Sequence, residues 1–214
     1  MLEIKKFTIN PLYENCYVVS DATLECVIID CGTYTAEERK EIKDYIAEKK
    51  LKPTHLLQTH AHIDHYIGNG FIAKEYGLKP ELHINEQPLV ENMSVQSELI
   101  FGKSLTDELP PVGKYFTGKD VIEFGTHTFN IIETPGHSPG GVFFYCKDEK
   151  ITFSGDTLFR GSIGRTDFMG GSMFQIIQSL RMICQLDDDV RVYPGHGEST
   201  TIGYECANNM YLDR

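Results

Sequence analysis

The pattern of apolar and polar positions predicts strands at the start of the chain. Three short runs rich in β-branched and aromatic residues, separated by Asn, Pro and Asp turn signals, occupy 4–10, 15–20 and 24–30. A helical period follows over 37–50, where Thr35 and Glu38 have the spacing of a capping box. The first fifty residues are therefore predicted to form β-hairpins followed by one helix.

The rest of the chain mixes strands with helices. Apolar runs predict strands at 54–58, 81–85, 121–124, 127–133, 141–146, 151–156 and 190–195. Helical spacing predicts helices at 68–76, about 86–103, 174–186 and from about 201. Gly77 is expected to end the first of these helices, and Pro110 and Pro111 to break the second. This order favours two packed sheets with helices outside, although periodicity alone does not exclude another α/β layering.

Composition narrows the setting of the protein. With 214 residues, 41% of them hydrophobic, the chain can bury a sizeable core, and one domain over 1–214 is expected. A net charge of −11 without a basic stripe disfavours nucleic acid as a partner. No secretory or membrane-spanning apolar run is visible, so a cytoplasmic protein without a membrane partner is expected. Six cysteines without a CxxC pair are expected to be reduced and mostly buried, and the oligomeric state is left open.

The main chemical signal is the segment His60-Ala61-His62-Ile63-Asp64-His65, which directly follows a predicted strand. It holds three of the eight histidines of the chain within six positions. His60 and His62 project to one side by the two-residue period, whereas Asp64 and His65 begin the next turn. One loop can thus address two metal ions. Imidazole and carboxylate suit zinc, and also iron and manganese.

Three later segments have the same character, a strand end that opens into a loop with one ligand-type side chain. These side chains are His137 in TPGHSPGG, Asp156 in FSGDT and His196 in YPGHG. Each motif is weak alone, because Pro-Gly turns are common. Four such presentations in one chain predict a shared metal site.

The segments THAHIDH, TPGHSPGG, FSGDTLF and YPGHG, in this order, resemble the metal motifs of the metallo-β-lactamase superfamily, and more closely its glyoxalase II (hydroxyacylglutathione hydrolase) branch. The resemblance covers nearly the whole chain. It implies an α/β fold, an αββα sandwich of two mixed sheets flanked by helices, with the metals at one edge. It also implies a first metal held by His60, His62 and His137, a second held by Asp64, His65 and His196, and Asp156 bridging both. The remaining histidines are expected to be structural: His55, His83 and His127.

The expected cofactors are two divalent metal ions, zinc first, with iron or manganese as alternatives. Two ions sharing Asp156 would acidify a bridging water enough to supply hydroxide at neutral pH. Asp64 is the candidate catalytic residue that orients this hydroxide and shuttles its proton. Arg160 and Arg165 are candidate substrate-binding residues, since the resemblance places a glutathione-binding basic residue near Arg165; a structural pair of Arg165 with Asp167 is an equal alternative.

The expected activity is thioester hydrolysis of the glyoxalase II type on a small-molecule thioester or ester-like substrate. The sequence runs only 18 residues past His196, so the helical domain that completes the glutathione pocket in that branch is expected to be missing. Glu198 also stands where that pattern has Tyr.

Three alternatives stay open. A persulfide dioxygenase-like oxidoreductase with a single iron shares the fold and the GRTDF run, although SGDTLF favours the hydrolases. Lactone or β-lactam hydrolysis uses the same metals, but a missing export signal disfavours β-lactams. A metal-binding protein without catalysis is the third.

Overall fold

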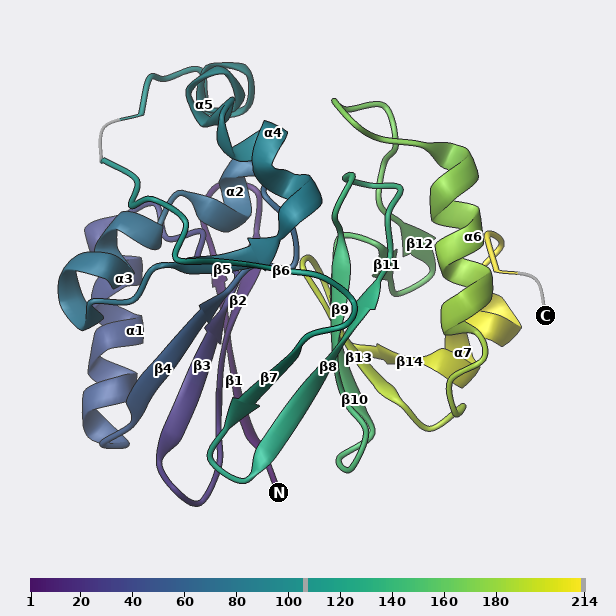
Figure 1. Cartoon of the computed structure of the whole chain (residues 1–214), viewed down its shortest axis with the longest axis horizontal. Coiled ribbons are helices and arrows are strands. Elements are labelled where there is room, and N and C mark those ends of the chain that lie inside the picture. Colours follow the sequence, from purple (N-terminus) through teal and green to yellow (C-terminus); the bar gives the residue numbers. More distant parts are fainter. Residues whose placement is uncertain (106–107, 213–214) are drawn as a thin grey trace.

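Two mixed β-sheets face each other, and helices cover their outer sides (Figure 1). The computed structural model describes residues 1–105 and 108–212. The first sheet has the order β1-β2-β3-β4-β5-β6, with strands β1 (Glu3–Ile9), β2 (Glu14–Ser20), β3 (Glu25–Ile29), β4 (Lys52–Leu57), β5 (Pro80–His83) and β6 (Lys114–Phe116). Its strands β1 to β3 pair antiparallel and β3 to β6 pair parallel.

The second sheet has the order β14-β13-β10-β9-β8-β7. Its strands are β7 (Val121–Phe124), β8 (His127–Glu133), β9 (Val142–Cys146), β10 (Ile151–Gly155), β13 (Arg191–Pro194) and β14 (Thr200–Thr201). Only β10 and β13 pair parallel in this sheet. A two-stranded ribbon, β11 (Leu158–Phe159) and β12 (Ser162–Ile163), follows β10.

The helices fall into three groups. The first sheet is covered by α1 (Ala36–Glu48) and α3 (Asn69–Tyr76), and the second by α6 (Met173–Ile183) and α7 (Ile202–Asn208) (Figure 1). Beyond one end of the first sheet lie α2 (Ile63–Tyr66), α4 (Gln87–Val90), α5 (Met93–Phe101) and the 3-10 turn η1 (Ile84–Glu86). This arrangement confirms the predicted sandwich of two mixed sheets flanked by helices.

The central core lies between the sheets and is aromatic. Tyr17 of the first sheet packs edge-on against Phe153 of the second, and Phe116 packs in the same way against Phe144. Separate apolar clusters join each sheet to its own helices. A fourth cluster, containing Ala61 and Ile63, packs under α4 and α5. The loop that follows β4 is therefore anchored in apolar packing.

The structure differs from the predicted elements mainly in the middle of the chain. The helix predicted at about 86–103 is two helices, α4 and α5, separated at 91–92. Gly102, in the left-handed conformation with φ +64°, ends α5, so the prediction that Pro110 and Pro111 break this helix was wrong. Four strands of two or three residues were not predicted, because they are too short to show a period: β6, β11, β12 and β14.

The burial of the cysteines and the end of α3 agree with expectation. Five of the six cysteines are buried, and the Sγ atoms of Cys184 and Cys206 lie 2.9 Å apart. In 1–105 and 108–212, no helix combines the length and the apolar character needed to cross a bilayer. Gly77 ends α3 in the left-handed conformation.

The predicted capping box of α1 is present. Thr35 Oγ1 accepts from the Glu38 N–H at 3.2 Å, and the Glu38 carboxylate accepts from the Thr35 N–H at 3.0 Å. Glu38 also accepts from the Asn10 N–H at 2.8 Å. The Asn10 amide in turn donates to the carbonyl of Asp64 at 2.9 Å, so the start of α1 is linked to the candidate metal loop.

Replacement of the helix cap should be measurable as lost stability. Thr35→Ala removes one acceptor at the start of α1, and we expect it to lower the free energy of unfolding by about 1 kcal/mol. Urea denaturation checks this value. Thr201→Ala, which removes the matching cap of α7, should cost a similar amount, whereas an unchanged midpoint for both variants would contradict the assigned caps.

Candidate metal centre

The four candidate residues of the loop after β4 are buried at the edge where the two sheets meet. His60, His62, Asp64 and His65 are between 0 and 7% exposed. His62 precedes α2, a single turn of helix that carries Asp64 and His65. The second pair therefore lies on a helical turn that follows the extended segment of the first pair, and the ring centroids of His60 and His65 are 4.2 Å apart.

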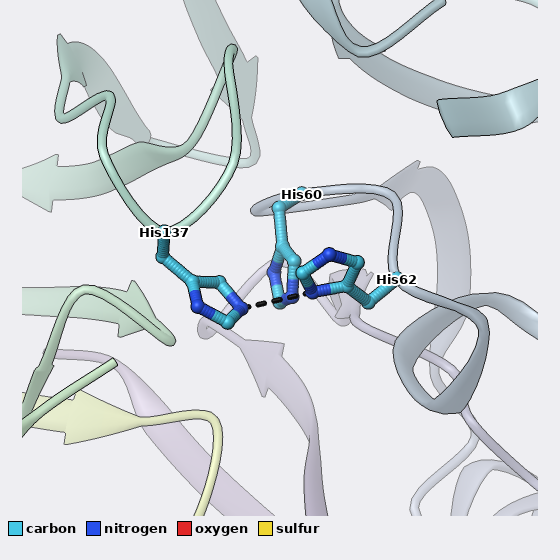
Figure 2. A group of neighbouring side chains, drawn as sticks. All are labelled: His60, His62 and His137. Carbon is cyan, nitrogen blue, oxygen red and sulfur yellow. Dashed lines mark hydrogen bonds between the residues drawn. The ribbon is translucent and has the colours of Figure 1, made fainter. Parts of the chain in front are cut away.

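The first predicted triad lies together. One ligand atom each of His60, His62 and His137 falls within 4.8 Å of the others. Figure 2 shows the three rings pointing toward one another, His60 and His62 from one loop and His137 from the facing one. His62 Nδ1 lies 2.9 Å from His137 Nε2. The two sheets thus contribute to one cluster of imidazole nitrogens.

The second predicted triad, Asp64, His65 and His196, also meets the 4.8 Å limit. His196 Nε2 lies 3.4 Å from Asp64 Oδ2 and 3.3 Å from His65 Nε2. Asp156 lies between the triads, because its carboxylate is 3.3 Å from His65 Nε2, 3.5 Å from His196 Nε2 and 3.6 Å from His137 Nε2. Its position suits a residue shared by two ions.

The donor set fits divalent cations. Among the described residues, Nε2 of His60 and Oδ1 of Asp156 are buried without a hydrogen-bond partner. A buried unpaired polar atom costs about 1–3 kcal/mol, which a bound cation would remove. Burial, reinforced by neighbouring histidines, lowers the pKa of His62 to about 3 and that of His60 well below its usual range, so both rings are neutral, the form that coordinates metal.

Burial opposes ionisation of Asp156, but the neighbouring His65 and His196 outweigh it and hold the pKa of this carboxyl well below its usual range. The site therefore presents an anionic carboxylate between two groups of imidazoles. Gly155 permits this placement: its φ is +48°, and a Cβ there would lie 2.3 Å from Thr59 Oγ1. The end of β10 thereby approaches the loop that carries His60.

Two ligand rings are oriented by backbone carbonyls. His137 Nδ1 donates to the carbonyl of Arg165 at 2.7 Å, and His196 Nδ1 donates to the carbonyl of Leu12 at 3.0 Å. Because Nδ1 is the donor in each bond, Nε2 of each ring is the nitrogen directed at the site and able to accept a cation. Residues on both sides of the cluster therefore select the tautomer that can bind a cation.

Asp30 and Glu14 were not predicted as site residues. Both are buried, and each has a carboxylate oxygen within 3.7 Å of His65 Nδ1. Asp30 accepts from the Thr59 N–H at 2.7 Å, from Thr59 Oγ1 at 2.6 Å and from His65 Nδ1 at 3.2 Å. Asp30, His60 and His65 also meet the distance limit for a metal group. Because the Asp30 oxygens already accept these three bonds, we assign Asp30 to orienting His65. Its sequence signal, an Asp that ends an apolar strand, is the one that identified Asp156.

Glu86 and Gln96, also missed, connect the metal loops to the middle segment. The Glu86 carboxylate accepts from the Ala61 N–H at 2.7 Å and from the Gly140 N–H at 2.5 Å, and so joins the His60 loop to the His137 loop. Gln96 accepts from the Ile63 N–H at 3.1 Å and donates to the Ala61 carbonyl at 3.1 Å. No sequence pattern distinguishes these two side chains from surface residues of a helix.

The candidate substrate residues lie in two different places. Arg165 forms a bidentate pair with Asp167, at 2.6 and 2.7 Å, stacks 3.9 Å from the centre of the Phe168 ring, and lines the cavity of the metal cluster. Arg160 lies over the ring of Tyr204 and lines a separate hollow. The structural pair of Arg165 is therefore present, and a substrate role of either arginine stays a prediction.

The other three histidines each contact a carboxylate outside the cluster. The pairs are His55 with Glu81 at 2.6 Å, His83 with Glu133 at 2.9 Å and His127 with Asp21 at 3.0 Å. These contacts agree with the structural roles expected for them.

An open cavity of about 740 Å³ lies over the cluster. Its polar lining includes Asp64, Asp156 and His196, and its apolar lining includes Leu12 and Phe159. A small molecule can therefore reach the candidate ligands from solvent.

A two-sheet sandwich with histidines and aspartates clustered at its edge is typical of a metallo-hydrolase. The model of the metallo-beta-lactamase superfamily matches residues 9–196, and the chain belongs to this family. The chain is 32% identical to hydroxyacylglutathione hydrolase GloC of Haemophilus influenzae, over 99% of both chains. Two solved structures are similar. BLEG-1 B3 metallo-beta-lactamase has 32% sequence identity and a TM-score of 0.90, and the match covers 99% of this chain and 100% of that one. TTHA1623 in a di-iron-bound form has 33% identity and a TM-score of 0.85, with 97% of this chain and 100% of that one covered.

Removal of the Glu86 carboxylate should weaken the site without touching a candidate ligand. Glu86→Ala leaves two buried N–H groups without an acceptor, so we expect stability to fall by about 2 kcal/mol or more. Because both histidine loops lose a common support, affinity for zinc should fall about 10- to 100-fold. Chemical denaturation and metal titration measure the two effects. Glu91→Ala, at an exposed position just after α4, is the matched control and should change neither; equal affinities of the two variants would refute the role of Glu86.

Proposed function

We propose that this metallo-hydrolase is a thioesterase of the glyoxalase II type, acting on S-2-hydroxyacylglutathione or a related small thioester. The observation that carries the proposal is the contact of Asp156 with both triads beneath an open cavity. Similarity to GloC over nearly the full length of both chains supports the choice of thioester.

In this proposal His60, His62 and His137 would hold one divalent ion and Asp64, His65 and His196 the other, and Asp156, whose carboxylate lies near histidines of both triads, would be available to both. The chemistry supplied by bound divalent cations is polarisation of a carbonyl and activation of water as a nucleophile at neutral pH. Asp64, which lines the cavity, would position the attacking water and accept its proton. Zinc is the proposed metal, and iron is the first alternative because TTHA1623 is described in a di-iron-bound form.

Arg165 is proposed to attract the carboxylates of the glutathione moiety, since this residue lines the cavity. The substrate is a small molecule, and neither nucleic acid nor a membrane is a proposed partner. A cytoplasmic setting is proposed because six mostly buried cysteines without a CxxC pair fit a reducing compartment.

Similarity to BLEG-1 favours a second candidate, hydrolysis of β-lactams on the same cluster. The cavity is open enough to admit a bicyclic ring. Nitrocefin assayed beside the thioester separates the candidates, because the proposed function requires the thioester to have the higher kcat/KM.

Metal content and thioesterase activity should both depend on the carboxylate of Asp156. Purified protein loaded with zinc should hold two ions per chain and hydrolyse S-lactoylglutathione. Asp156→Asn should lower kcat/KM at least about 100-fold and reduce the metal content, because the anionic contact to both triads is lost. Asp44→Asn, an exposed change on α1, is the control and should retain both properties.

Atomic absorption and release of free thiol provide the two measurements. One iron per chain, oxygen uptake with glutathione persulfide and no thioester cleavage would contradict the proposed function.

A further inference from the structure

A second, smaller pocket opens beside the metal centre. It has a volume of about 160 Å³ and lies between α5 and the loop at 168–169. His62, Leu99, Ile100 and Phe168 line both this pocket and the larger cavity over the cluster. The two spaces are therefore neighbouring arms of one site, and His62 of the first triad lies where they meet.

Apart from the His62 ring, which it shares with the larger cavity, the small pocket has an apolar wall. Its two amide side chains are engaged with backbone groups: Gln96 bonds to Ile63, Ala61 and Leu89, and the Asn92 amide donates to the carbonyl of Pro88 at 2.8 Å. Lys, Arg, Asp and Glu are absent from the lining among the described residues. A charged or strongly hydrated group would lose its water there without compensation.

Exposed apolar side chains gather at the same pocket. Val95 and Leu99 of α5 are 54% and 80% exposed, and Met169 is 50% exposed. Such a group is unfavourable in water unless a ligand covers it. Gln96 ties α5 to the loop between His60 and His65, so this wall has a fixed position relative to the metal centre.

We propose that the pocket between α5 and 168–169 binds an apolar acyl substituent of the thioester, about the size of a phenyl ring. The inference rests on the proposed function and names the substrate class of its site. An apolar cavity of roughly 150 Å³ is known to admit benzene, close to the volume found here. The larger arm, about 740 Å³ with Arg165 on its lining, takes the bulky charged thiol part. The natural substrates are thus 2-hydroxyacyl thioesters with an aryl or similarly large apolar group at C2.

Two glutathione thioesters that differ only at C2 test this assignment on the zinc-loaded protein. One carries methyl (lactoyl) and the other phenyl (2-hydroxy-2-phenylacetyl). We expect kcat/KM to be at least about 10-fold higher for the phenyl compound, because several additional carbons enter an apolar pocket. Equal values, or preference for methyl, would overturn the proposal while leaving thioester hydrolysis in place.

Val95 lines the small pocket and not the metal cavity, so Val95→Phe should narrow only that arm. In this variant, the ratio of kcat/KM for the phenyl thioester to kcat/KM for the methyl thioester should fall about 10-fold. Val121→Phe makes the same change at a similarly exposed position of β7 that lines neither space, and should keep the wild-type ratio. Met169→Glu, which places a carboxylate at the pocket, should lower the ratio as well.

Binding of the free acids, which are not hydrolysed, tests the pocket independently of catalysis. In calorimetry, 2-hydroxy-2-phenylacetate should bind about 10-fold more tightly than lactate, and Val95→Phe should remove the difference. If neither thioester is cleaved but this difference is found, the proposed function fails and the apolar acid-binding pocket stands. If the two acids bind equally, the pocket assignment is wrong whatever the activity.

Discussion

The structure depends on the burial of ionisable side chains at the edge between two sheets. Five imidazoles and two carboxylates from separate loops converge at a site where most of these side chains are buried. In a low-dielectric site, such groups are unfavourable unless opposite charges meet. The arrangement is therefore stable only where each carboxylate contacts imidazoles, as Asp156 does, or where cations occupy the space between them. Metal binding and folding of these loops are thermodynamically linked for this reason.

The surrounding chain holds these loops through polar contacts to backbone rather than through contacts to the ligands alone. Asn10, Asp30, Glu86 and Gln96 each bond to the backbone of the loop after β4 or its flanks. Glu86 also reaches the loop of His137, which belongs to the other sheet. The relative position of the two sheets is thus set at the site as well as in the aromatic core. A change in one sheet can therefore alter the position of both triads of candidate ligands.

Much of this arrangement was predictable, because ligand motifs and helix caps are local in sequence. The capping box at Thr35 and the stop at Gly77 depend on neighbouring residues, and both were read correctly. The two triads were implied by the resemblance of the motifs to the metallo-β-lactamase superfamily, and the structure brings their members together. Glu86 and Gln96 were missed because their partners lie 25 to 54 positions away, so no local pattern marks them. The short strands escaped prediction for a related reason: tertiary pairing, not periodicity, forms them.

The middle segment links the metal centre to the choice of substrate. Glu86 and Gln96 belong to η1 and α5, the part of the chain where the sequence was least informative. The inward side of α5 supports the loop of His62 through Gln96, and its exposed side presents Val95 and Leu99 to the pocket. The helix α5 therefore both supports the ligand loop and lines the pocket. If the proposed acyl pocket is correct, substitutions on the exposed side of α5 change the acyl group that fits while Gln96 keeps the ligand loop in place, so specificity varies with the metal site held constant.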